Sequence, residues 1–182
     1  MSRLPDIESA PMTDAQRRVF DMIASGPRGV VQGPLRVWLH SPDLAERAQA
    51  LGAFCRYGTS LPAKLSEIAI LVTGAHWRAG FEWHVHAPIA IKAGIAPAAA
   101  EAIRVGRDPG FTDPAEAAVY ALATELLRTR AVSEATYARA VAALGPTGVV
   151  DLVAVLGYYG FISMTINAFA VALPEGAPDP FA

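Results

Sequence analysis

Residues 63–92 read AKLSEIAILVTGAHWRAGFEWHVHAPIAIK, and this stretch holds most of the chain's chemically active side chains. Within it, section 76–86 contains three of the four histidines, two of the three tryptophans and one glutamate. Apolar residues recur along the chain at helical spacing, with glycine and proline between the segments, and no alternating run is long enough for a sheet. We therefore predict an all-α fold.

Capping residues, proline and glycine mark the ends of several predicted helices. Thr13 or Asp14 caps the first helix, and Asp113 caps a later one whose first residue is Pro114. Gly94 is expected to end the helix that carries the histidines. Further helices are predicted over 42–58, 96–106, 133–144 and 152–173.

The two halves of the sequence echo each other. TDAQRRVFDMIA (13–24) resembles TDPAEAAVYALA (112–123), and LSEIAILVTG (65–74) resembles VVDLVAVLGY (149–158). The unequal offsets indicate a duplicated helical unit with loop insertions. We predict one domain over 1–182. It would comprise an N-terminal arm (about 1–12), a functional helical unit (about 13–106) and a structural repeat (about 111–173).

Composition narrows the class of protein. The 182 residues are 53% hydrophobic, which is enough for one sizeable core, and the net charge is −2 with lysine and arginine scattered singly. Nucleic acid is therefore not expected as a partner. The single cysteine, Cys55, leaves no intrachain disulfide, and residues 1–12 lack the apolar core of a signal peptide. Both observations favour a cytoplasmic location.

Residues 152–173 carry no charged side chain and are about long enough to span a bilayer. They include several polar side chains, and no basic cluster flanks them to set an orientation. We expect a helix buried on all sides, partly by another subunit, and no membrane span.

Glu82 and His86 lie four residues apart, so on a helix they can touch. At 100° per residue, His76, Ala79, Glu82, Trp83 and His86 fall within a sector of about 120°. A carboxylate beside an imidazole orients the ring and raises its pKa, as in general acid/base catalysis. A surface salt bridge is the alternative interpretation.

Two other chemistries fit the sequence less well. His84 and His86 point about 200° apart on a helix, and no HExxH motif occurs, so a metal site is not favoured. Nucleophilic catalysis by Cys55 requires a nearby base and, for peroxide turnover, a second thiol, and neither occurs in AFCRYG (53–58). We expect Cys55 to be a buried apolar residue.

The segment SLPAKLSEIAILVTGAHWRAGFEWHVHAPIAIKAGI (60–95) resembles the carboxymuconolactone decarboxylase family, which includes alkylhydroperoxidase-like proteins. The segments 33–54 and 152–176 extend the resemblance to about residues 4–176. It implies an all-helical fold and a closed homo-oligomer, such as a dimer, trimer or hexamer. It also implies a carbon–carbon lyase without a cofactor or metal, acting on a small carboxylated or lactone substrate.

In the peroxidase branch of this family, a glutamate precedes a Cys-x-x-Cys pair and a histidine follows four residues later. Glu67 and His86 match the outer members of that pattern, whereas Ala79 and Glu82 occupy the cysteine positions and Phe81 replaces a second histidine. No thiolate remains at these positions to attack a peroxide. The resemblance therefore implies an acid/base site without the redox pair.

We predict that Glu67, Glu82 and His86 are catalytic and that His76, Trp83 and Tyr158 contact the substrate. In one unbroken helix, Glu67 would lie about 28 Å from His86. The site implied by the resemblance thus requires a break between Gly74 and Gly80, where glycine permits a turn.

Three arginines, Arg36, Arg56 and Arg78, are candidates for binding a dicarboxylate, although each can equally be a surface charge. Two other function classes stay open. The chain can be a non-catalytic helical assembly protein whose polar pair holds subunits together, or a residual peroxidase that uses Cys55 alone.

Overall fold

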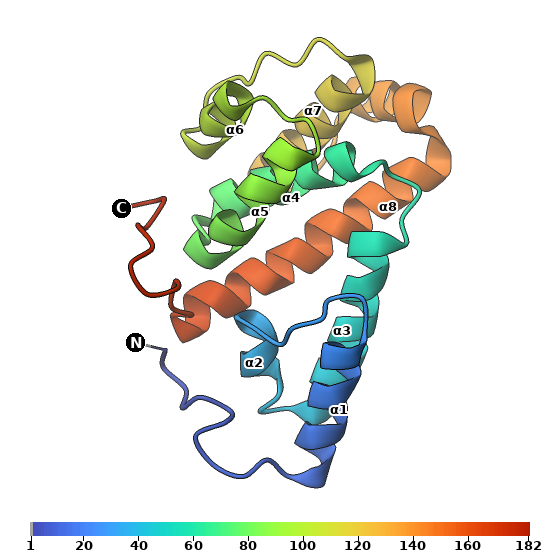
Figure 1. The fold of residues 1–182 in the computed structure, drawn as a ribbon. Helices are drawn as coiled ribbons and strands as arrows, with labels where there is room; N and C mark the ends of the chain where they lie inside the picture. The colour runs from blue at the N-terminus through green and yellow to red at the C-terminus, as the bar shows by residue number, and fades with distance from the viewer. Residues whose placement is uncertain (1) are drawn as a thin grey trace.

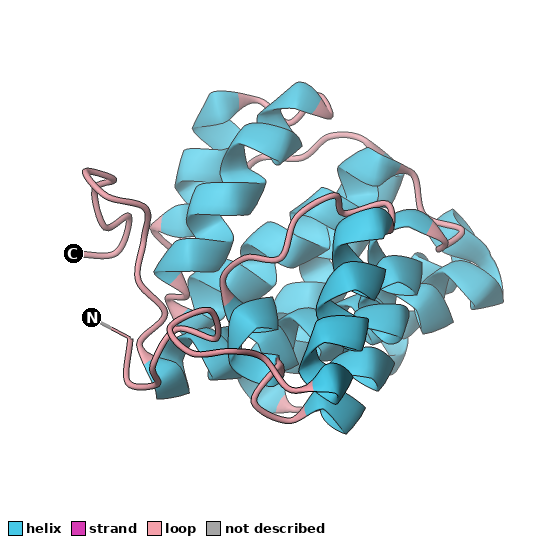
Figure 2. Cartoon of the chain, turned by 60° about the horizontal axis from the view of Figure 1, so that its bottom comes forward, coloured by secondary structure: helices cyan, strands magenta, loops and turns pink. Residues whose placement is uncertain are grey.

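The structure, a computed structural model, describes residues 2–182, and every regular element in that range is a helix (Figure 2). The predicted all-α fold is confirmed. The helices are α1 (Asp14–Ser25), α2 (Pro34–Trp38), α3 (Pro42–Tyr57), α4 (Ala63–Trp77), α5 (Gly80–Lys92), α6 (Pro97–Arg104), α7 (Pro114–Thr129) and α8 (Glu134–Phe169).

Thr13 and Asp113 cap the N-termini of α1 and α7, as the sequence predicts. The Thr13 hydroxyl accepts a hydrogen bond from the Gln16 amide while the Gln16 side chain accepts one from the Thr13 amide, which forms a capping box. The Asp113 carboxylate likewise accepts from the amides of residues 115 and 116, with Pro114 as the first helical residue. Both predicted caps are confirmed, because they depend only on neighbours within one turn.

Helix α8 crosses the middle of the molecule (Figure 1) and contacts α2, α3, α4, α5 and α7. It bends at Gly145, which adopts φ 69° and ψ 169°, and Pro146 follows without an amide hydrogen to donate. The two helices predicted over 133–144 and 152–173 are therefore present as two segments of α8 that meet at Gly145, and the second begins earlier than predicted.

One face of α8 is exposed in the single chain, so the expectation that another subunit covers part of the last helix stays a prediction. Val150 is 68% exposed, and Val153 and Met164 are also exposed on α8. Across residues 2–182, α8 is the one helix whose length and composition would suffice to cross a membrane. The opposite face of α8 is buried and contributes side chains to the hydrophobic core.

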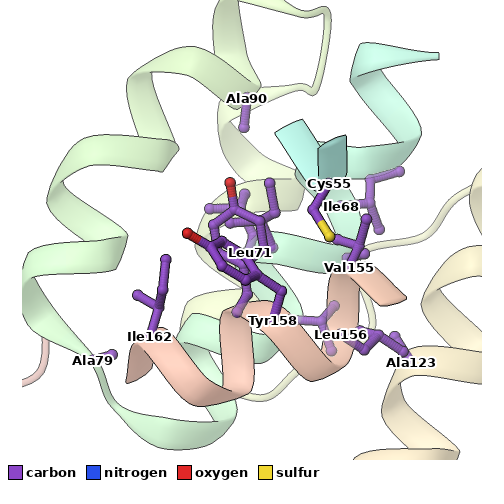
Figure 3. Packing of buried hydrophobic residues seen from close by; sticks show 14 of the residues in the cluster. Cys55, Ile68, Leu71, Ala79, Ala90, Ala123, Val155, Leu156, Tyr158 and Ile162 are labelled. Carbon is purple, nitrogen blue, oxygen red and sulfur yellow. The ribbon is translucent and has the colours of Figure 1, made fainter. Parts of the chain in front are cut away.

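The core forms where α8 packs against α4. Residues 65–74 of α4 are all buried, and Figure 3 shows Ile68 and Leu71 beside Val155 and Leu156 of α8. Cys55 of α3 lies in the same cluster and is completely buried, in agreement with the sequence expectation. Helix α7 packs against both α4 and α8. The division into a functional unit and a structural repeat stays a prediction.

Gly52 of α3 lies directly under the ring of Tyr158, and a Cβ atom there would overlap both that ring and the guanidinium of Arg28. We expect Gly52→Ala to lower the free energy of unfolding by about 1–2 kcal/mol, because overpacking outweighs the better helix propensity of alanine. The matched control is Gly157→Ala in α8, where nothing lies within 4 Å of the added atom and about 1 kcal/mol should be gained. Urea denaturation of both variants checks this, and equal stabilities would contradict it.

Candidate active site

The chain turns back between α4 and α5, as the sequence predicts. The Ala79 amide donates to the Gly74 carbonyl at 2.9 Å and the Arg78 amide donates to the Ala75 carbonyl at 3.1 Å, which is a Schellman ending. The left-handed residue, however, is Arg78, with φ 50° and ψ 41°. The expected use of glycine is therefore wrong: Gly74 lies inside α4, and Gly80 is the first residue of α5.

This turn brings Glu67 of α4 to the face of α5 that carries Glu82 and His86. His86 Nδ1 lies 2.9 Å from Glu67 Oε2, and His86 Nε2 lies 3.0 Å from Glu82 Oε1. The imidazole is thus held between two carboxylates, one from each helix. Each contact has the length of a charge-assisted hydrogen bond.

All three side chains are buried, with 5% of Glu67, 4% of Glu82 and 3% of His86 exposed. Burial is the largest single influence on His86 and disfavours its protonated form, but the two carboxylates together outweigh burial and raise the pKa of His86 to about 9. At neutral pH the ring is therefore an imidazolium.

Tyr159 of α8 covers one side of the imidazole. Its ring meets His86 edge to face, with 5.1 Å between the ring centroids. Burial, followed by the nearby carboxylate of Glu82, raises the pKa of Tyr159 far above its usual range, so the phenol stays protonated. Tyr159 contributes a neutral wall.

A cavity of about 100 Å³ opens onto this group. Glu82 and His86 line it, whereas Glu67 lies behind the ring, away from the cavity. The remaining walls come from the loop before α2, from α2, α3, α5 and α8, namely Arg28, Val30, Gln32, Pro34, Leu35, Arg56, Phe81, Val85, Tyr159 and Ile162. A molecule in the cavity therefore meets Glu82 and His86 directly.

Of the three candidate arginines, only Arg56 reaches this cavity. Arg36 is paired with Asp6 and Glu8, and Arg78 donates to the carbonyl of Phe181. Sequence reasoning missed the second cavity arginine, Arg28, which lies in the loop between α1 and α2. That loop carries no motif that could have singled it out.

The three residues predicted to contact a substrate do not line this cavity. His76 is exposed at the end of α4 beside a different cavity, because the turn at Arg78 removes it from the helical sector of His86. Trp83 is buried against Phe181 of the C-terminal segment, with 5.6 Å between ring centroids. Their roles in binding stay predictions that the geometry does not favour.

Tyr158 lies one layer behind the cavity. Its hydroxyl accepts a hydrogen bond from Arg28 at 3.2 Å, and burial raises its pKa to about 12. Tyr158 therefore positions Arg28 rather than facing the cavity itself.

Both ring nitrogens of His86 are engaged by carboxylates. Within residues 2–182, no group of three or more histidine, cysteine or acidic side chains is arranged to hold a metal ion. What this site can do by itself is hold a proton, pass it between the imidazole and Glu82, and deliver it to the cavity.

Residues 42–125 match the carboxymuconolactone decarboxylase family, which confirms the resemblance over that range. Among solved structures, a peroxidase-related protein from a Silicibacter species is 14% identical over 94% of this chain and 91% of its own, with a TM-score of 0.76. The debrominase Bmp8, solved without ligand and as a cysteine-to-alanine variant with 2,3,4-tribromopyrrole, is 15% identical over 96% of this chain and 91% of its own, with a TM-score of 0.70. These likenesses show the alkylhydroperoxidase-like fold. A comparison with curated proteins gave no significant match.

Proposed function

From a chain whose residues 42–125 match the carboxymuconolactone decarboxylase family, we propose a cofactor-free acid/base enzyme that acts on a small carboxylated or lactone substrate. One observation carries this proposal: the His86 imidazole lies between the Glu67 and Glu82 carboxylates, buried at the wall of a cavity. A buried, oriented imidazolium with a carboxylate facing the substrate is a device for moving a proton.

The proton path follows from the geometry. Glu82 Oε1 accepts the Nε2 proton of His86 and passes it into the cavity, while Glu67 at Nδ1 orients the ring and stabilises its charge. Because the pKa of His86 is about 9, the ring carries a proton ready for transfer at neutral pH. Solvent restores that proton after each turnover.

For decarboxylation, we consider a β-keto acid. The bond to the carboxylate breaks, its electron pair moves into the neighbouring carbonyl to form an enolate, and carbon dioxide leaves. The α-carbon then takes a proton from Glu82, which His86 replenishes, so the product is a ketone. With a lactone, the same pair would move a proton on the carbon next to the lactone carbonyl. In both cases the carbonyl of the substrate accepts the electron pair from the neighbouring carbon, so the intermediate is an enolate.

The two alternatives have less support. A protein that uses the polar group only to hold subunits together needs no space beside it, whereas a cavity of about 100 Å³ adjoins Glu82 and His86. A peroxidase needs an accessible thiolate, whereas Cys55 is completely buried, and burial together with Asp151 raises the pKa of its thiol.

The experiment follows small β-keto acids and lactones by proton NMR in heavy water, with and without the protein. We expect protein-dependent loss of carbon dioxide and one solvent deuterium on the α-carbon of the product. If no member of either class reacts faster than in buffer, the proposal is wrong.

The variant Cys55→Ser separates the proposal from the peroxidase alternative. We expect it to retain the turnover of the unaltered protein within about twofold, because Cys55 only fills core space and serine is nearly isosteric. Hydroperoxide consumption by the unaltered protein that disappears in Cys55→Ser would instead establish a thiol peroxidase.

A further inference from the structure

We propose that Arg28 and Arg56 form an anion subsite that holds the carboxylate of a short-chain acid against Glu82 and His86. This inference deepens the proposed function and rests on it for the reaction, but the binding step stands on the contacts of the two arginines alone. Both arginines line the same cavity as Glu82 and His86.

Neither arginine has an acidic partner of its own within residues 2–182. The Arg28 guanidinium donates one hydrogen bond, to the Tyr158 hydroxyl at 3.2 Å. Its Nε atom is buried and has no hydrogen-bond partner. Arg56 lies over the ring of Tyr57, 5.4 Å from its centroid. A buried N–H that lacks an acceptor is costly unless a ligand supplies one.

Three arginines elsewhere on the surface are paired with carboxylates. Arg18 is paired with Glu46, and Arg104 is paired with Glu101. The third is Arg36, and the remaining arginines outside the cavity, like Arg28 and Arg56, have no salt bridge within residues 2–182. What distinguishes Arg28 and Arg56 is therefore their place on the wall of the cavity beside Glu82 and His86.

The charge balance of the site also calls for an anion. Arg28, Arg56 and the protonated His86 are positive, whereas Glu67 and Glu82 are negative, so one positive charge is left uncompensated at neutral pH. A monocarboxylate neutralises it. The forked guanidinium donors match the two oxygens of such a group better than they match a neutral carbonyl.

The cavity limits the length of that acid. A cavity of about 150 Å³ accommodates benzene, which has six non-hydrogen atoms, so about 100 Å³ suits roughly four, the size of a carboxylate with a short carbon chain. Phe81 closes one wall, because its ring packs on Gly33 where a Cβ atom would overlap it. With the carboxylate at the arginines, the carbon chain lies among Leu35, Phe81 and Ile162. The substrate class is therefore a short aliphatic acid, not a large aromatic one.

The experiment titrates the protein with propanoate and with propanamide, its neutral counterpart of equal size, and follows binding by NMR chemical shifts of the cavity residues. Arg28→Gln and Arg56→Gln are compared with Arg47→Gln, an exposed arginine on α3 that bonds the backbone of its own helix at 2.7 Å. We expect propanoate to bind and propanamide not to. Each cavity substitution should weaken propanoate binding about tenfold to a hundredfold, and Arg47→Gln should leave it unchanged.

Equal binding of the acid and the amide would overturn the subsite, as would undiminished propanoate binding in both cavity variants or no binding of propanoate at all. These outcomes are separate from those of the proposed reaction. Arginine-dependent binding without turnover of any β-keto acid or lactone would leave the subsite standing and refute the enzyme. Turnover of a β-keto acid or lactone, together with propanoate binding that does not depend on either arginine, would support the enzyme and refute the subsite.

Discussion

Replacing Glu82 by glutamine is expected to lower turnover of a β-keto acid by about 10²–10⁴-fold, the usual contribution of a positioned acid or base. Glu82 is the carboxylate that both contacts His86 Nε2, at 3.0 Å, and lines the cavity. Glutamine has nearly the same shape but cannot accept a proton from the imidazolium and release it again. The measurement is the initial rate of carbon dioxide release.

The controls separate lost chemistry from lost structure. Glu175→Gln removes an exposed carboxylate from the C-terminal segment and should leave the rate unchanged. Glu82→Asp keeps an acidic group at a shorter reach and should recover part of the rate. Urea denaturation shows whether each variant is folded under assay conditions. A folded Glu82→Gln variant that turns over at the rate of the unaltered protein would remove Glu82 from the mechanism.

Raising the pH from 6.5 to above 9 is expected to lower the free energy of unfolding by about 3 kcal/mol through His86 alone. Below pH 6.5 the ring is protonated in both the folded and the unfolded chain, and the two carboxylates stabilise it in full. Between pH 6.5, the ordinary pKa of histidine, and about pH 9, the pKa of His86 in the folded chain, only the folded chain keeps the proton. The stabilisation is therefore lost as the pH rises, and it is gone above about pH 9.

The measurement is a series of urea denaturation curves across this range for the unaltered protein, His86→Gln and His84→Gln. His84 lies two residues away on α5 but is exposed, so His84→Gln should keep the pH dependence of the unaltered protein. The difference between the unaltered protein and His86→Gln should shrink as the pH rises. Parallel profiles for these two proteins would show that the charge on His86 does not stabilise the fold.

Much of the local structure was predictable from the sequence. The caps at Thr13 and Asp113 depend on groups within one turn of the chain, so the residue types alone specify them. The pairing of Glu82 with His86 follows from four-residue spacing on one helix. Resemblance to a family added the role of Glu67, because nothing in the spacing of residues 67 and 86 places them together.

Other features of the site depend on how the helices pack. Arg28 lies in a loop without any motif, and it reaches the cavity because α2 and α3 pack against α8. In one unbroken helix, His76 would share a sector with His86. The left-handed turn at Arg78 instead sends α5 in another direction and leaves His76 exposed. Trp83 is covered by Phe181, a residue almost one hundred positions away.

The sequence by itself determined the helices, their caps and the contact between Glu82 and His86, because each of these involves atoms within one or two turns of one helix. The tertiary structure shows how Glu67, which the family resemblance implied, reaches the group, and it alone decided that two arginines line the adjoining cavity and that His76 and Trp83 do not. The physical reason is that the direction in which a helix leaves a turn decides which distant side chains it meets. Here a single residue, Arg78, sets the direction of α5.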